Sequence, residues 1–397
     1  DPARVVAVKA ALADTRARWE QLETTLQARY GALAARPSVD PLRSPRLLLP
    51  NGDDVLLDFV VSPERTIVFV FSRRGEELSI ARHIIAAGED ALARDVDRFL
   101  NRLGSGSFDY DDDARRLHRL LLAPAAAQLR GAKRIGIVAD GPLWRLPFQV
   151  LQGSDGEPLA ASHTIFYAPS LESLLRPPAE TVERPAVLAI GNPRFGGEAA
   201  ALMRARTRET LGDLPDAGVE ARTIARMYDD AQLLTGAEAT ESALKEHAGE
   251  FDVLHIAAHA VTDDAQPLYS AIMLAPDPSR EGEDGILEAR EITRLPLRAR
   301  LAVISACSTA QGKVRPGEGI IGLSWAFLVA GCPTIVASQW RVPSASTARL
   351  MIEFHRELSR GVAPPEALQR AQMTMMSDRR YRHPFHWAAF VVVGAGR

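Results

Sequence analysis

The chain of 397 residues has little cysteine and almost no net charge, and each shortage excludes a class of protein. Two cysteines cannot build the disulfide framework of a small secreted domain, so we expect free thiols in a reducing cytoplasm. A formal net charge of −3 lacks the basic excess that displaces counterions from nucleic acid. We therefore expect no direct nucleic-acid binding.

Long hydrophobic runs are also missing. No stretch approaches the roughly 18 consecutive apolar residues of a transmembrane helix, and no signal peptide opens the chain, so we expect no membrane contact. The composition, 46% hydrophobic and 24% charged, is typical of a globular protein. Because the sequence begins at Asp1 without a methionine, we expect a fragment of a longer polypeptide.

The length predicts at least two domains, and the pattern along the chain divides it further. Residues 1–45 consist of a segment with apolar positions at helical spacing, to about residue 35, and a proline-rich linker. Three β-rich runs separated by turn residues then predict a meander or hairpins, at 54–62, 65–72 and 76–84. Helical patterns follow at 89–103 and 114–130.

A second strand-rich half begins near residue 180. Near-continuous apolar strands alternate there with amphipathic helices, at about 216–229, 240–249, 317–330, 344–360 and 363–377. This alternation predicts an α/β fold with a mostly parallel sheet and helices on both faces.

Two of the predicted strands end in residues that can do chemistry together. "FDVLHIAAHA" leads to His259, and "LAVISAC" leads to Cys307, 48 residues later. The carboxyl ends of parallel strands meet at one edge of an open sheet. A thiol becomes a strong nucleophile when a neighbouring imidazole takes its proton. The spacing is close to that of the caspase histidine and cysteine.

The alternative for each of these residues is a structural role. Free cysteines are commonly buried hydrophobes, and we interpret Cys332 within "VAGCPTI" in this way. His255, between Leu254 and Ile256, is interpreted as a core histidine. Taken singly, Cys307 and His259 leave both interpretations open; their pairing at two strand ends favours catalysis.

Two further motifs are weaker. "GEGIIG" at 317–322 matches G-x-G-x-x-G, but it follows a polar loop rather than a strand, and no acidic residue ends the next strand. We interpret its glycines as allowing a helix to pack closely on the sheet. His383 and His386 have no accompanying cysteine or carboxylate cluster, so we expect a structural role and no metal site.

Several segments in order resemble the CHAT-domain family, caspase-like cysteine peptidases related to separase. They are "IGIVADGPLWRLPFQVL", "LPDAGVEARTIARMY", "DVLHIAAHA", "LAVISACSTAQG", "PTIVASQW" and "HPFHWAAFVVVG". The resemblance covers residues 130–397 well and extends more loosely back to about 46. It implies a catalytically silent caspase-like domain at 46–180, which contains no cysteine, and an active caspase-like peptidase domain at 181–397. Residues 1–45 would then end an upstream helical-repeat region.

The resemblance also assigns roles to residues. His259 corresponds to the general base and Cys307 to the nucleophile, and the backbone N–H groups of Ala260 and Cys307 would form the oxyanion hole. No cofactor or metal is expected. The family usually has glycine where this chain has Ala260, a substitution that would strain a backbone with positive φ.

The substrate pocket departs from the family pattern. Many relatives have acidic residues after the tryptophan of "QWRVPSAST", and this chain has none there. The acidic candidates that remain would favour a basic residue before the cleaved bond. The full set of candidates for substrate binding is Asp263, Asp264, Glu318, Trp340 and Arg341. We expect the polar loops at 276–288 and 311–317 to shape substrate access and to become ordered on activation.

The sequence thus predicts a cysteine endopeptidase that cleaves protein or peptide substrates and is controlled by an activating partner or an upstream helical-repeat domain. The alternative is a caspase-like interaction scaffold that no longer cuts. Retention of both His259 and Cys307 favours the enzyme.

Overall fold

The computed structural model describes Thr15 and residues 44–106, 108–175, 182–195, 197, 200, 212–263, 266–308 and 318–394. The predicted helical segment at 1–45 therefore lies almost wholly outside the described residues, as do Asp264 and the loop at 311–317. The boundaries predicted for the two caspase-like domains stay predictions.

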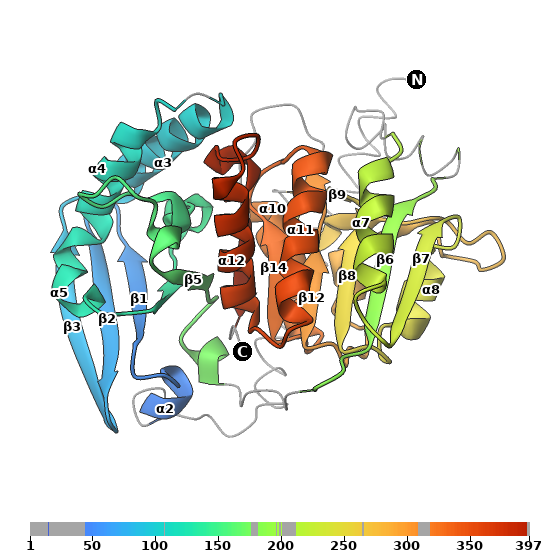
Figure 1. Ribbon diagram of the computed structural model, residues 1–397, viewed down its shortest axis with the longest axis horizontal. Coiled ribbons are helices and arrows are strands. Elements are labelled where there is room, and N and C mark those ends of the chain that lie inside the picture. Colours follow the sequence, from blue (N-terminus) through green and yellow to red (C-terminus); the bar gives the residue numbers. More distant parts are fainter. Residues whose placement is uncertain are drawn as a thin grey trace.

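The described residues form a large, mostly parallel sheet with helices on both faces, which confirms the predicted fold class (Figure 1). The outer pairs β3–β2 and β2–β1 are antiparallel, as is β15–β14, and the other neighbours run parallel. The strands lie in the order β3 (Glu77–Ile85), β2 (Thr66–Arg74), β1 (Asp54–Val61), β4 (Arg134–Val138), β5 (Thr164–Tyr167), β15 (Phe390–Gly394), β14 (Thr334–Ser338), β12 (Leu301–Ile304), β8 (Val253–Ala257), β6 (Val187–Pro193) and β7 (Ala231–Gly236).

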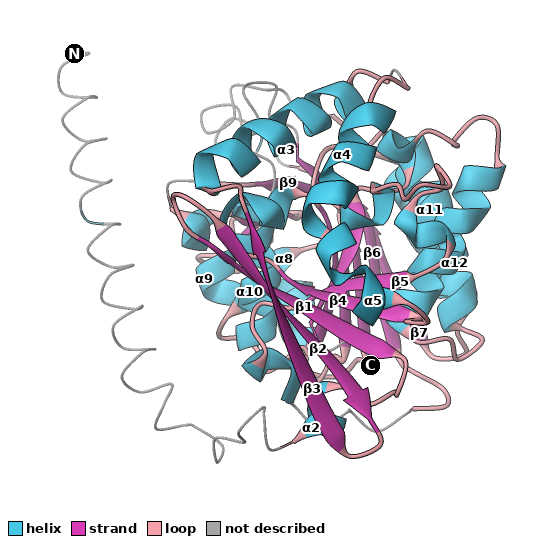
Figure 2. Cartoon of the chain, turned by 90° about the vertical axis from the view of Figure 1, so that its left-hand side faces the viewer, coloured by secondary structure: helices cyan, strands magenta, loops and turns pink. Residues whose placement is uncertain are grey.

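Helices cover the second half of the sheet on both sides (Figures 1 and 2). One layer contains α7 (Pro215–Ala225), α11 (Ser344–Leu358) and α12 (Pro364–Ser377); the other contains α8 (Glu241–His247), α9 (Ala289–Ile292) and α10 (Glu318–Val329). The strands bury both faces accordingly. Along β12, Leu301 and Val303 join one apolar core, whereas Ala302 and Ile304 join the other. This explains the near-continuous apolar strands of the sequence.

The first half begins with α2 (Pro45–Leu48), continues with the antiparallel meander β1 to β3, and then forms α3 (Glu89–Gly104) and α4 (Asp111–Leu121). The single helix predicted over 114–130 is wrong. The helix ends at Leu121, a 3₁₀ turn covers Ala123–Ala125, and α5 is only Ala126–Leu129. Pro124 has no N–H to continue the helical hydrogen bonds, which accounts for the break.

A second, four-stranded sheet carries the residues of interest. Its order is β11 (Ile286–Glu288), β10 (Ala271–Met273), β9 (His259–Val261) and β13 (Cys307–Ser308). The strand predicted over 251–260 is thus two strands, because the chain leaves the main sheet after Ala257 and pairs again from His259. None of the helices in the described part of the chain is long and apolar enough to cross a membrane.

One carboxyl group in the first half should make stability depend on pH. Burial, together with the negative charge of Asp140, raises the pKa of Asp58 on β1 to about 6. The folded protein therefore binds this proton more tightly than the unfolded chain, and the stability that it contributes at acidic pH is lost as the pH rises from about 4 through 6.

We expect Asp58→Asn, which keeps the group neutral, to raise the free energy of unfolding by about 1 kcal/mol at pH 8. The gain should disappear near pH 4. Urea unfolding at pH 4, 6 and 8 measures it, with Glu64→Gln on the exposed turn beside β1 as the control. A pH-independent difference between Asp58→Asn and the parent would contradict the assignment.

Candidate active site

His259 opens β9 directly after the chain leaves the main sheet, and its side chain is 5% exposed. Its Nε2 lies 2.9 Å from the backbone oxygen of Gly212, ahead of α7. A carbonyl oxygen can only accept a hydrogen bond, so Nε2 carries the proton and the lone pair of the neutral imidazole is on Nδ1. The ring of Phe195 packs beside the imidazole with the ring centroids 5.7 Å apart.

Cys307 opens β13 and lies directly opposite His259 in the ladder of the small sheet. The parallel pairing that joins β8 to β12 in the main sheet, ending with Ile304 opposite Ile256, resumes here with Cys307 opposite His259. Neighbouring strands lie about 4.8 Å apart. The structure thus brings together the two residues that the sequence places at strand ends 48 residues apart.

Ala260 occupies the middle of β9, where it pairs with Ile272 of β10 and Ser308 of β13 and is 5% exposed. Among the described residues other than glycine, only Asn192 has a positive φ. The backbone at Ala260 is therefore ordinary strand, and alanine in place of the usual glycine introduces no left-handed strain.

The candidates for substrate binding come from separate segments of the chain. The backbone N–H of Asp263 donates to Ser270 Oγ at 3.0 Å, and Asp263 Oδ1 accepts from the N–H of Gln266 at 2.9 Å. Trp340 follows β14 and donates from Nε1 to the Phe385 oxygen at 3.2 Å. Partly buried Arg341 comes next, and Glu318 begins α10. A shared pocket for these residues stays a prediction.

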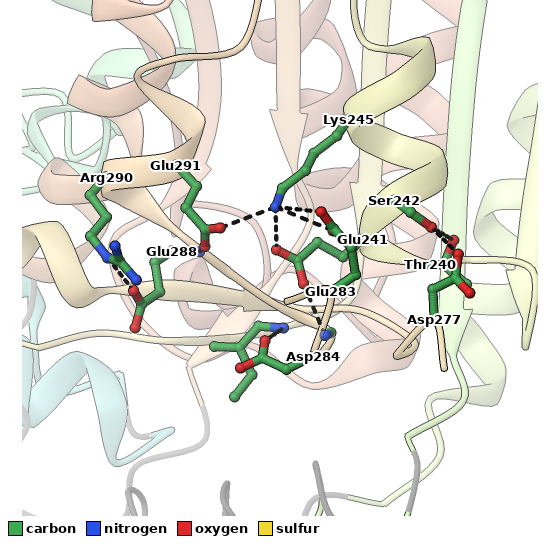
Figure 3. Close-up of polar contacts among 12 residues, drawn as sticks. Thr240, Glu241, Ser242, Lys245, Asp277, Glu283, Asp284, Glu288, Arg290 and Glu291 are labelled. Carbon is green, nitrogen blue, oxygen red and sulfur yellow. Dashed lines mark hydrogen bonds and ion pairs between the residues drawn. The ribbon is translucent and has the colours of Figure 1, made fainter. Parts of the chain in front are cut away.

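The loop at 276–288 is fastened to α8 by charge (Figure 3). Lys245 Nζ contacts carboxylate oxygens of Glu241 at 2.8 Å, Glu283 at 3.2 Å and Glu291 at 3.0 Å. Glu241 is 1% exposed and also accepts from the N–H of Gly285 at 2.9 Å. Burial acts to lower the pKa of Lys245, but its hydrogen bonds to Glu241 and Glu291 outweigh burial and raise it. Because residues 274–285 join β10 to β11, the edge strand of the small sheet, these contacts of Lys245 form a clamp that holds the outer edge of that sheet.

The remaining sequence candidates have structural contacts. Cys332 is fully buried, and its Sγ lies 3.4 Å from the Thr334 oxygen. His383 Nδ1 accepts from the N–H of Phe385 at 3.2 Å, and His386 Nδ1 lies 3.3 Å from Ser346 Oγ. The described part of the chain contains no group of three or more histidine, cysteine or acidic residues arranged to hold a metal.

Two contacts of His259 have no signal in the sequence. Gly212 acts through a backbone carbonyl, which every residue has, and Phe195 follows β6 without any motif around it. Only the fold, which places the segment before α7 next to β9, identifies them.

The CHAT domain family matches residues 111–395, and the chain belongs to this family. Tetratricopeptide repeat protein 28 of human and of mouse is 26% identical over 333 residues, covering 71% of this chain. The chain spans only 13% of the length of these relatives.

Solved structures of separase show a similar fold. Separase in the Saccharomyces cerevisiae separase–securin complex matches 89% of this chain and 31% of its own chain, with a TM-score of 0.55 and 11% identity. The Arg-specific cysteine proteinase gingipain R matches 71% of this chain and 67% of its own, with a TM-score of 0.43 and 12% identity. The likeness to separase establishes a caspase-like fold and nothing about activity.

The Lys245 clamp gives a stability prediction. Lys245→Met leaves the buried Glu241 carboxylate beside two other glutamates without its cation, so we expect a loss of about 3 kcal/mol in the free energy of unfolding. Arg280→Met is the control, because Arg280 pairs with Glu246 at the surface and both side chains are 49% exposed. It should cost less than about 1 kcal/mol. Urea unfolding measures both, and equal losses would contradict the clamp.

Proposed function

We propose that this chain is a cysteine endopeptidase that cleaves protein or peptide substrates through His259 and Cys307. The observation that carries the proposal is the register of the small sheet, in which these two residues are directly opposite. Membership of a family with a caspase-like fold supports it.

The imidazole is prepared for the role of base. With Nε2–H held by the Gly212 oxygen, Nδ1 is the nitrogen that takes the thiol proton. The thiolate of Cys307 attacks the carbonyl carbon of the substrate, and the resulting imidazolium is stabilised at Nε2–H by the same carbonyl. General-base catalysis of this kind contributes about 10²–10⁴ in rate.

The reaction then completes in balanced steps. The carbon–nitrogen bond breaks as His259 returns its proton to the leaving amine, which leaves a thioester on Cys307. Water loses a proton to His259 and attacks the thioester, and the carboxylic product leaves as the thiol is restored. We assign the oxyanion to the N–H groups of Ala260 and Cys307, each worth about 10²–10³ in rate. This chemistry requires no cofactor.

Substrate selection and control belong to the same proposal. Asp263, Asp264, Glu318, Trp340 and Arg341 are the residues that we propose to surround the substrate. The curated relatives are named as tetratricopeptide repeat proteins and extend far beyond this chain, which supports control by an upstream repeat region. We place the enzyme in the cytoplasm, because its two cysteines suit a reducing compartment.

Labelling with peptide acyloxymethyl ketones that carry Arg, Lys, Leu or Asp before the reactive group tests the proposal. We expect one modification, mapped to Cys307, retained in Cys332→Ala and lost in Cys307→Ala. His259→Ala should reduce the labelling rate at least 100-fold. The preferred peptide reports the specificity.

The scaffold alternative predicts a different result. A small alkylating reagent would then reach Cys307, yet no peptide ketone would label it, with or without the upstream region of the longer protein. That outcome would overturn the proposed activity.

A further inference from the structure

A buried series of polar contacts, one at ion-pair distance and two of them hydrogen bonds, lies one strand segment away from the candidate site. His255 Nε2 on β8 is 3.0 Å from Glu220 Oε1 on α7, and His255 Nδ1 is 3.1 Å from His355 Nε2 on α11. His355 Nδ1 is in turn 2.9 Å from the hydroxyl of Tyr228, just beyond α7. Both histidines are fully buried and Glu220 is 1% exposed. The proposed reaction uses none of these groups.

These contacts connect α7, β8 and α11. The Glu220 carboxylate and the His255 imidazole lie at ion-pair distance, and one hydrogen bond joins His255 Nδ1 to His355 Nε2. The Tyr228 hydroxyl contacts His355 Nδ1 and also lies 3.5 Å from the His355 backbone oxygen, to which it can donate. Burial, with the neighbouring His255, lowers the pKa of His355 well below its usual value, which agrees with a neutral ring.

Helix α7 connects these contacts to the general base. α7 begins at Pro215, three residues after Gly212, whose carbonyl holds His259. The segment containing α7 therefore contacts the β8–β9 segment twice, through Glu220 at His255 and through Gly212 at His259. Asn192 at the end of β6 holds the start of the helix, since its Oδ1 accepts from the N–H of Leu214 at 2.6 Å.

Helix α7 packs closely on the sheet. At Gly191 on β6 the helix approaches so closely that an added Cβ would lie 2.5 Å from the Ala217 oxygen and from the Ala221 Cβ. This contact between small groups fixes the separation of helix and strand. The ion-pair contact of Glu220 with His255 and the hydrogen bond of Leu214 with Asn192 are polar contacts that depend on the position of the helix along the strands.

We propose that Glu220 and His255 are positioning residues that fix α7 along β8 so that the Gly212 carbonyl meets Nε2 of His259. His355 and Tyr228 complete the arrangement by tying both to α11 and to the chain after α7. The effect of these residues on the tautomer of His259 is independent of the proposed function, whereas their effect on catalysis rests on it.

The test compares two substitutions on one face of α7. Glu220→Ala removes the carboxylate that contacts His255, whereas Ile224→Ala, four residues on and fully buried, opens a cavity and leaves the polar contacts in place. Both variants should lose stability, but only the first should disturb His259. Glu220→Gln keeps an oxygen at the same place and is the conservative variant. Glu220→Met, similar in length to glutamate, replaces Glu220→Ala if that variant does not fold.

Nitrogen NMR of protein labelled at histidine reads the tautomer of His259, whose signals are assigned by their loss in His259→Gln. We expect a protonated Nε2 and an unprotonated Nδ1 in the parent, in Ile224→Ala and in Glu220→Gln. Glu220→Ala should show averaged nitrogen shifts and a rapidly exchanging Nε2 proton. An unchanged His259 in Glu220→Ala, or an equal change in Ile224→Ala, would overturn the proposal.

Kinetics of labelling by the preferred peptide ketone gives the second readout. We expect Glu220→Ala to lower the maximal labelling rate at least tenfold with little change in the concentration for half-maximal rate, and Glu220→Gln to stay within threefold of the parent. If the parent is not labelled at all, the proposed function fails, while the NMR comparison still decides the positioning role.

Discussion

The arrangement of the site depends on one constraint: two neighbouring parallel strands leave the main sheet together and stay in register. β8 and β12 end level with each other, and their continuations pair again as β9 and β13. A shift of one residue in either crossing would separate His259 from Cys307 and reverse the faces on which they lie. The loop clamp at Lys245 and the contacts of α7 fasten the small sheet from two directions, one at its outer edge and one at its histidine.

Much of the main sheet could be predicted from the sequence because its central strands are continuously apolar. The runs that became β8, β12 and β14 are buried on both faces, and α3 and α4 have buried apolar residues at helical spacing. The two strand ends predicted that His259 and Cys307 lie together, and segments that resemble the CHAT family implied their roles as base and nucleophile, which stay predictions.

What could not be predicted is of two kinds. β9 and β13 contain three and two residues, too few to show any period, so they read as the tail of a longer strand. The other kind is set by tertiary contacts. No motif around Lys245 predicts its contacts with three carboxylates from separate segments. The contact of Gly212 is made by a backbone carbonyl, which every residue has, so the sequence does not predict it either. Similarly, His255 is a core histidine as predicted, but its partners Glu220 and His355 come from helices on either side of it in sequence.

The position of β15 has a consequence for how the molecule is made. This last strand lies between β5 and β14, with Val393 opposite Tyr167, and so joins the two halves of the main sheet. Gln149 of the first half also donates to the Ala388 oxygen at 2.6 Å, next to the same strand. A ribosome must therefore complete β15 before the sheet can close, because the joining strand follows every other strand of the sheet in sequence. A nascent chain that ends before β15 lacks this seam, so its two halves cannot yet share one sheet.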